Sequence, residues 1–196
     1  VLSNPRNASL GNITEHTYTI NPSDVPPDWP MWRYDANRSG ASPFELPATL
    51  YLRWVLVLPP LEPAWPDEAR ITFDHYYAPI VLGKKMFVGS SRNDKVTAYN
   101  IDTGAEIWRF YADAPIRMAP AGQPAFGMTG QPDRLFVACD DGNLYCLNAE
   151  NGALLWKFRG APTDRKVLGN KRLVSAWPAR GAPTILDGNV YFAAGI

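Results

Sequence analysis

The residues best suited to acid–base or metal chemistry are few and scattered along the chain. Asp74, His75 and Tyr76 stand together and could move protons, but the sequence places no nucleophile or second metal ligand near them. We therefore expect His75 to be a loop histidine, and His16 is equally isolated. The segment 140–143, Asp-Asp-Gly-Asn, is similar to the start of a calcium loop but lacks the glutamate at the twelfth position, so it predicts a hairpin turn.

The two cysteines form no redox or haem motif. They flank that hairpin, and a turn centred on Asp141–Gly142 would place Cys139 opposite Leu144 and Cys146 opposite Val137. Such a pair misses the register of a cross-strand disulfide, so we expect two small buried thiols. No Cys-x-x-Cys-His sequence occurs, which excludes covalent haem within this span.

Composition limits the classes of partner. Lys plus Arg and Asp plus Glu number 19 each, and a balanced charge argues against nucleic-acid binding. No run of 18 apolar residues occurs, so no transmembrane segment is predicted. Aromatic residues at 12%, with 19 Pro and 15 Gly, are typical of an all-β protein rich in hairpins. The chain starts at Val1 without a signal sequence, and we expect a processed product or a fragment.

One stretch of sequence occurs twice. Residues 98–108 read Ala-Tyr-Asn-Ile-Asp-Thr-Gly-Ala-Glu-Ile-Trp, and 48 residues later 146–156 read Cys-Leu-Asn-Ala-Glu-Asn-Gly-Ala-Leu-Leu-Trp. A period of 40 to 50 residues is typical of propellers and solenoids. Each copy predicts the last two strands of a blade, joined by a turn at its glycine.

The repeat divides the chain. Residues 1–28 are polar and rich in proline, and they predict an extended linker or arm. Residues 29–196 predict a partial β-propeller of four-stranded antiparallel blades, about two and a half in number. The blades are expected at 78–111 and 124–159, and a further one starts at 182–196. The expected strands are 78–81, 85–90, 95–100 and 106–111, then one near 124–128, then 134–139, 143–148 and 154–159.

Two further segments belong to this architecture. Segment 51–58 contains Leu-Arg-Trp-Val, which is similar to the outer strand of each repeat but lacks a hairpin of its own. We predict that it is a closure strand whose Trp54 corresponds to the repeated tryptophans. Two and a half blades cannot close a ring, so we expect missing sequence or another chain to supply the remaining blades. The aromatic segment 29–34 is expected to plug an apolar surface, the alternative being a ligand-binding clamp.

The repeated pattern resembles the tryptophan-docking motif of the pyrroloquinoline-quinone-dependent dehydrogenase propellers and their non-enzymatic secreted bacterial relatives. The matching residues are Ala98, Asn100, Thr103, Gly104 and Trp108, then Cys146, Asn148, Asn151, Gly152 and Trp156. The resemblance implies a quinoprotein-like propeller, eight-bladed when complete, in a secreted, periplasmic or cell-envelope protein. It also implies that each motif tryptophan packs across to the neighbouring blade, so Trp108 and Trp156 should be of similar importance.

The enzymes of that family hold the quinone with Ca²⁺ or a lanthanide. Glu and Asn side chains bind the metal, an Asp acts as base, a Trp lies under the quinone, and two adjacent cysteines often form a disulfide. This chain has no Cys-Cys pair, and none of its acidic residues lies in a matching segment. We therefore expect no cofactor. The alternative is a pyrroloquinoline-quinone-dependent oxidoreductase of the alcohol dehydrogenase type, whose Ca²⁺ and quinone site lies in blades absent from this chain.

Two long connections, 59–77 and 160–181, are expected to open on the same face of the disc, where functional residues concentrate. The first is mainly acidic and the second mainly basic, so they either pair with each other or form a binding face for a protein or glycan. The candidate binding-face residues are Trp65, Arg70, His75, Arg165, Lys166, Lys171, Arg172, Trp177 and Arg180. The sequence thus predicts a non-catalytic binding or scaffold module.

Overall fold

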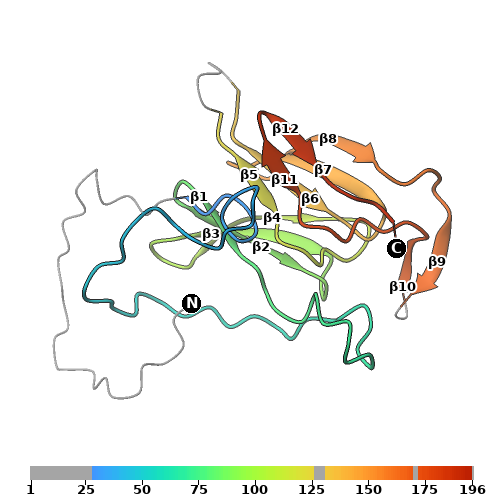
Figure 1. Ribbon diagram of the computed structural model, residues 1–196, viewed down its shortest axis with the longest axis horizontal. Coiled ribbons are helices and arrows are strands. Elements are labelled where there is room, and N and C mark those ends of the chain that lie inside the picture. Colours follow the sequence, from blue (N-terminus) through green and yellow to red (C-terminus); the bar gives the residue numbers. More distant parts are fainter. Residues whose placement is uncertain (1–27, 126–130, 170–171, 196) are drawn as a thin grey trace.

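The computed structural model describes residues 28–125, 131–169 and 172–195, all in strands, turns or irregular segments (Figure 1). Nearly all of the linker predicted for residues 1–28 therefore lies outside the described residues. The described ranges contain no helix that is long and apolar enough to cross a membrane. The strands form two four-stranded antiparallel sheets and two hairpins, so the chain is all-β.

The first blade is a sheet of four consecutive strands. They are β1 (Ile80–Leu82), β2 (Lys85–Ser90), β3 (Lys95–Asn100) and β4 (Glu106–Tyr111), paired in that order. The bounds of the last three coincide with those expected from the sequence, whereas β1 begins two residues later. Gly83 makes the first turn with a φ of 57°, a conformation that is free of steric cost only in glycine.

The second blade repeats this order. Its strands are β5 (Ala121–Gln123), β6 (Arg134–Ala138), β7 (Asn143–Asn148) and β8 (Leu154–Arg159). The outer three again lie close to the expected ranges. The innermost strand does not, because β5 ends just before the predicted range 124–128, most of which lies outside the described residues.

Gly122 explains the position of β5. Its N–H donates to the carbonyl of Pro30 at 2.6 Å, and a Cβ at this position would lie 3.1 Å from Leu82 and 3.4 Å from Ile80. The missing side chain thus lets the inner strands of the two blades approach closely. This contact joins residues far apart in the chain, so the local pattern of apolar residues did not indicate it.

The turn between β6 and β7 is wider than predicted. Ala138 pairs with Leu144, whereas the sequence had placed Cys139 there, and Cys146 pairs with Phe136. The shift arises because the turn closes through a hydrogen bond from Gly142 N–H to the Cys139 carbonyl at 3.0 Å. Both cysteines are buried and free, and burial raises the pKa of each thiol, to about 11 for Cys146.

The connection after β8 contains a hairpin that the sequence analysis did not predict. Its strands are β9 (Lys166–Gly169) and β10 (Arg172–Ser175), which form a separate two-stranded sheet. After it, β11 (Thr184–Leu186) and β12 (Asn189–Tyr191) pair as the first two strands of a third blade, within the predicted range 182–196. The inner strand β5 contacts the inner strands β1 and β11 of the two neighbouring blades. The blades therefore follow one another with their inner strands together, as in a β-propeller.

The first two blades are joined through a tryptophan of the outer strand. Trp108 on β4 is 9% exposed, and its indole lies so close to Gly152 that a Cβ there would come within 2.6 Å. Its Nε1–H donates to the carbonyl of Ala149 at 3.1 Å. The glycine turn and the indole therefore fit together as one inter-blade contact.

Segment 51–58 makes a related contact and forms no strand with the described residues, so its role as a closure strand paired with strands from outside this chain stays a prediction. No backbone hydrogen bond joins it to another described residue, and side chains hold it instead. Trp54 lies against Gly104 and donates to the carbonyl of Ile101 at 2.8 Å, and Arg53 pairs with Asp102 at 2.5 Å. A strand needs a backbone neighbour, and the described residues provide none here.

The aromatic segment near the start divides into a buried and an exposed part. Trp29 exchanges two backbone hydrogen bonds with Val81, each of 2.9 Å, and Met31 is buried. Trp32 is 44% exposed, with the Arg38 guanidinium 5.2 Å from its ring. The first part therefore lies against the inner edge of the first blade, while the second faces solvent.

Candidate functional site

Three connections meet on one face of the blades, and each leads into an inner strand. They are residues 59–79 before β1, 112–120 between β4 and β5, and 160–183 between β8 and β11. The middle one carries Arg117, whose side chain is only 2% exposed. This arginine is the centre of the contacts that hold the three connections together.

Arg117 binds groups from two sides. Its Nη1 donates to Asp74 at 2.8 Å and to the carbonyl of Glu62 at 2.5 Å, while its Nε donates to Asp140 at 2.6 Å. Asp140 also accepts hydrogen bonds from Nε and Nη2 of Arg180, at 3.0 and 3.2 Å. One network thus ties both flanking connections to the middle connection and to the β6–β7 turn.

This network is buried and balanced in charge. Asp74 and Asp140 are each 1% exposed, and two arginines neutralise the two carboxylates. Isolated charges at this depth would be strongly unfavourable, and removing one partner of such a pair typically costs about 3 to 5 kcal/mol. The network therefore fixes the relative positions of the three connections.

A second, more exposed group of charges joins the β9–β10 hairpin to the first blade. Arg172 on β10 pairs with Asp94 of the β2–β3 turn and, at 3.3 Å, with Glu62, which also pairs with Arg92 at 2.5 Å. Burial raises the pKa of Asp94, and the charge of Arg172 partly offsets this. Of the two alternatives left open by the sequence, pairing between the acidic and basic connections is realised for Arg172 and Glu62.

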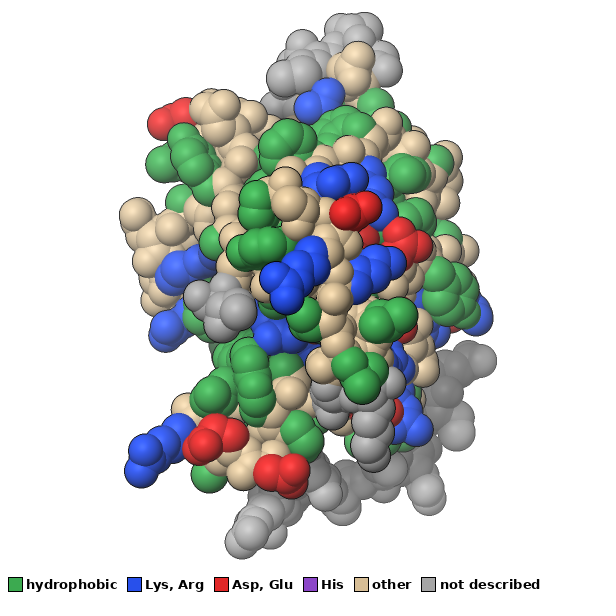
Figure 2. Space-filling model, turned by 90° about the vertical axis from the view of Figure 1, so that its right-hand side faces the viewer, with side chains coloured by type: hydrophobic (Ala, Val, Ile, Leu, Met, Phe, Trp, Pro, Cys, Tyr) green, Lys and Arg blue, Asp and Glu red, His purple; other side chains and the backbone are tan. Residues whose placement is uncertain are grey.

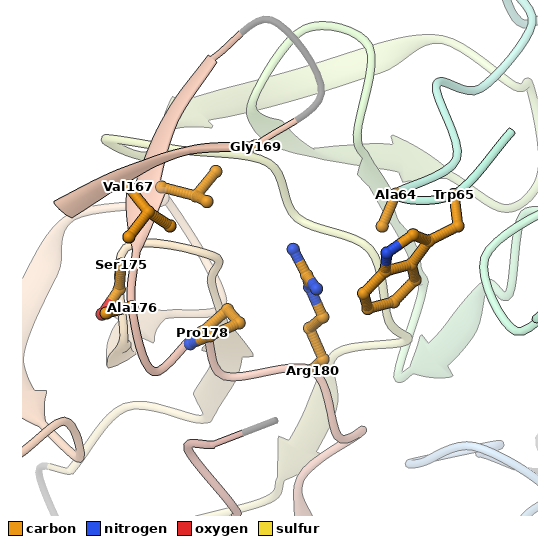
Figure 3. A pocket seen from close by; sticks show the side chains of 9 residues that line it. Ala64, Trp65, Val167, Gly169, Ser175, Ala176, Pro178 and Arg180 are labelled. Carbon is orange, nitrogen blue, oxygen red and sulfur yellow. The ribbon is translucent and has the colours of Figure 1, made fainter.

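Between these contacts lies a hollow of about 290 Å³. Figure 3 shows Trp65 on one wall, the hairpin side chain of Val167 on the other, and Arg180 between them. The guanidinium of Arg180 lies 4.7 Å from the centre of the Trp65 ring, and Phe73 contacts that ring edge-on at 5.7 Å. The remaining lining residues are Ala64, Gly169, Val174, Ser175, Ala176 and Pro178.

The surface around the hairpin mixes charge and apolar area. Figure 2 views the molecule from the side where β9 and β10 lie in Figure 1, and it shows Lys and Arg close to Asp and Glu and among apolar side chains. Leu168 and Leu173 of the hairpin are 77% and 64% exposed. Exposed apolar side chains of this kind are typical of an interaction surface.

The structure brings only some of the predicted binding-face residues together. Trp65 and Arg180 line the hollow, and Arg172 braces its hairpin. Arg165 and Lys166 are exposed on that hairpin, whereas Arg70 is exposed on the first connection and does not line the hollow. His75 and Trp177 are half-buried outside the lining, His75 with its Nε2 unpaired, and Lys171 lies outside the described residues.

Arg117 and Asp140 were not among the residues predicted from the sequence. A signal for Arg117 existed, because Ala-Pro precedes each inner strand, at 78–79, 119–120 and 182–183, and Arg117 and Arg180 each stand two residues before it. That alignment would also have placed β5 correctly. Asp140 had no comparable signal, since Asp-Asp-Gly is already explained by the turn.

The described residues do not fit the quinone and its metal ion. The buried carboxylates Asp74 and Asp140 are both paired with arginine, and no group of three or more His, Cys, Asp or Glu residues in the described ranges could hold a metal ion. Cys139 and Cys146 are separate buried thiols. The expectation that the protein has no cofactor stays a prediction.

Comparison with known proteins agrees with the blade architecture. A family model described as outer membrane protein assembly factor BamB matches residues 62–173 and, in a second alignment, 92–195. The two matches together cover more than half of the sequence. The chain belongs to this family. No curated protein sequence matches it.

This BamB-family chain is also similar to solved structures. Quinohemoprotein alcohol dehydrogenase from Comamonas testosteroni is 18% identical with a TM-score of 0.53, over 86% of this chain and 23% of that one. BamB from Moraxella catarrhalis is 19% identical with a TM-score of 0.36, over 57% and 40%. The chain thus spans less than half the length of either protein, and at 18% identity the likeness to the alcohol dehydrogenase shows the quinoprotein-like β-propeller fold alone.

Proposed function

We propose that this chain is a non-catalytic binding or scaffold module that presents its loop face to a protein partner. The loop face consists of residues 59–79, 112–120 and 160–183. The observation that carries the proposal is the network around Arg117, which holds these connections in one arrangement beside an open hollow. A binding surface whose parts are fixed in advance loses little conformational entropy when a partner binds.

The composition of the loop face favours a protein partner. Trp65 and Arg180 are of the residue types that dominate binding energy at protein interfaces, and the β9–β10 hairpin beside them exposes two leucines. The family is described as an outer membrane protein assembly factor, which supports a protein partner in the periplasm or cell envelope. A glycan partner stays a prediction from the sequence.

Site-specific photo-cross-linking tests this function. A photo-reactive amino acid replaces Arg165 on the loop face, and the matched control replaces Lys84, an exposed cation in the β1–β2 turn on the opposite face. Irradiation in the envelope fraction of the cells that make the protein should give one discrete cross-linked protein from position 165 and none from position 84. Equal products at the two positions, or none at 165, would contradict the proposal.

A second assay addresses the oxidoreductase alternative. The chain is incubated with pyrroloquinoline quinone and Ca²⁺, and dye-linked oxidation of short alcohols is measured. We expect no oxidation above the rate of free quinone. Alcohol oxidation that depends on the protein would contradict the scaffold proposal and favour the oxidoreductase.

A further inference from the structure

The β9–β10 hairpin is supported on one side only. On β10, Val174 and Ser175 are each 3% exposed, and Ser175 donates its N–H to the Asp140 carbonyl at 2.8 Å. On β9, no residue is buried. A two-stranded sheet is marginally stable in water by itself, and a third strand stabilises it. The open edge of this small sheet is therefore β9.

The backbone of β9 faces outward at two residues. Because Ser175 donates to Asp140, its pair with Lys166 is a pair without mutual hydrogen bonds. Such pairs alternate along an antiparallel ladder, so the N–H and C=O groups of both Lys166 and Leu168 point away from β10. Neither residue shares a backbone hydrogen bond with another described residue outside the hairpin. These groups offer a strand edge of unpaired donors and acceptors.

The two faces of the hairpin are both apolar. Val167 pairs with Val174, both line the hollow, and Val167 lies opposite Trp65 (Figure 3). Leu168 pairs with Leu173, and both are exposed on the other face. Side chains of an added strand would alternate between these faces, beside Val167 on one and beside Leu168 on the other. Apolar side chains on an added strand thus find apolar neighbours.

The charged residues at the β9 edge favour a partner segment with negative charge. Arg165 and Lys166 begin this edge, both are exposed, and neither has an ion-pair partner among the described residues. Arg172 on the neighbouring strand is already paired with Asp94 and Glu62. Acidic side chains on an added strand would therefore meet two unpaired cations at its edge.

We propose that β9 captures an extended, acidic and apolar segment of a protein partner as a third strand of the β9–β10 sheet. Main-chain hydrogen bonds to Lys166 and Leu168 hold the segment, and its alternate side chains pack beside Val167 over the hollow. The inference rests on the proposed function and specifies how the loop face binds its partner.

A peptide titration tests the main-chain part. The probe is a fluorescein-labelled octapeptide that alternates valine with glutamate and threonine, and its binding to the whole chain is followed by anisotropy. N-methylation of alternate peptide nitrogens, on the edge that faces β9, should weaken binding at least tenfold, whereas N-methylation on the other edge should change it less than twofold. No binding at 1 mM, or equal binding of the two methylated peptides, overturns the inference.

Two matched protein variants locate the edge. Leu168→Pro removes the outward N–H of β9, and Leu173→Pro removes the outward N–H of the cross-strand partner on β10, so neither breaks the hairpin's own ladder. Leu168→Pro should lower the peptide affinity at least tenfold, and Leu173→Pro less than twofold. Near-ultraviolet circular dichroism checks the fold of both. Equal affinities of the two variants overturn strand addition at β9. If either variant fails to fold, the titration of the unaltered chain with the two methylated peptides decides between the outcomes.

The cross-linking experiment separates this inference from the proposed function. It is repeated with the photo-reactive residue at position 165 in the Leu168→Pro background. Loss of the cross-linked partner supports strand addition. An unchanged product means that the loop face binds a protein without strand addition, which overturns the inference and leaves the proposed function standing. No product even in the unaltered background means that the proposed function itself fails.

Discussion

The junction between the first and second blades and the junction between the second and third blades are built from the same repeated residues, yet they differ in burial. Trp108 at the first junction is 9% exposed, and the corresponding Trp156 on β8 is 38% exposed. The corresponding arginines differ in the same sense, Arg117 being 2% exposed and Arg180 17%. A repeated residue is therefore buried by the blade that follows it, and the repeat alone does not determine how much it stabilises.

The second junction shows what a partly covered blade face is like. Every residue of β8 is exposed, and Trp156 and Phe158 border a hollow of about 490 Å³ with Val190 and Phe192 of the third blade. At the first junction the turn that contains Gly152 packs against the ring of Trp108. The described part of the chain has no such turn against Trp156. Contrary to the expectation from the sequence, Trp108 should therefore contribute more to stability than Trp156.

The largest difference is expected for the tryptophans. Trp108→Ala should lower the free energy of unfolding by about 4 kcal/mol, because it leaves a cavity at a closed interface and removes a hydrogen bond to Ala149. Trp156→Ala should lower it by about 1 kcal/mol, because that ring is already partly in water. Urea unfolding followed by circular dichroism measures both. Equal losses would mean that Trp156 is covered in solution, and the comparison between the junctions would then break down.

Arg117 and Arg180 allow the two junctions to be compared on the loop face. Arg117→Ala leaves Asp74 and Asp140 buried with less compensation, so we expect a loss of about 3 kcal/mol in urea unfolding. Arg180→Ala leaves Asp140 paired with Arg117, and we expect about 1 kcal/mol. A larger loss for Arg180 than for Arg117 would show that the network is centred on the third connection.

The glycine turns explain why a short motif specifies so much of the fold. Asn100 accepts hydrogen bonds from the N–H groups of Asp102 and Thr103, and Asn148 does the same for Glu150. Each turn is thus determined by residues close in sequence. This is why the predicted ranges of the strands on either side coincide with those found.

The features that the strand and turn patterns did not indicate depend on contacts between distant residues. The position of β5 depends on Gly122 meeting the first blade, and the role of Arg117 depends on Asp74 and Asp140 approaching from other segments. Segment 51–58 has the pattern of a strand, and the strands predicted to pair with it are not among the described residues. The binding-face residues were chosen by charge and aromatic content, and only the fold shows which of them share a hollow.

A smaller effect separates the strain of the glycine turn from its contact. Gly152 and Gly83 both have positive φ, of 75° and 57°, but only Gly152 faces an indole, that of Trp108. Gly83→Ala should cost about 1 kcal/mol from backbone strain, and Gly152→Ala about 2 to 3 kcal/mol because the methyl group also displaces the ring. Thermal unfolding of the two variants gives the difference. If the two costs are the same, Trp108 does not need the glycine.

The smallest effect concerns the residue beside Trp156. Strand alternation turns Lys157 to the other side of β8, where it bonds Asp113 at 2.7 Å in the connection that leaves the first blade, and Asp141 at 3.1 Å. The hydrogen bond from Lys157 lowers the pKa of Asp113 below 3.8. Burial lowers the pKa of Lys157, but its bonds to the two carboxylates outweigh this and raise it above 10.5. Neighbouring residues of β8 thus serve different junctions: Lys157 supplies a charge to the first, and Trp156 supplies its indole to the second.

Lys157→Met removes that charge and keeps a straight side chain over the Tyr145 ring, which Lys157 Nζ approaches to 4.6 Å. A carboxylate with a lowered pKa stabilises the fold above its unfolded pKa and loses this contribution as pH falls through the folded value. A lysine with a raised pKa stabilises the fold below its unfolded pKa and loses this contribution as pH rises through the folded value.

The variant should therefore be less stable by about 0.5 kcal/mol, an amount reduced by solvent screening, between about pH 5 and pH 9. The difference from the unaltered chain should fade below pH 3.8 and above pH 10.5. Urea midpoints across this range test it, and a difference that persists unchanged at pH 2.5 would mean that Lys157 acts through packing rather than through charge.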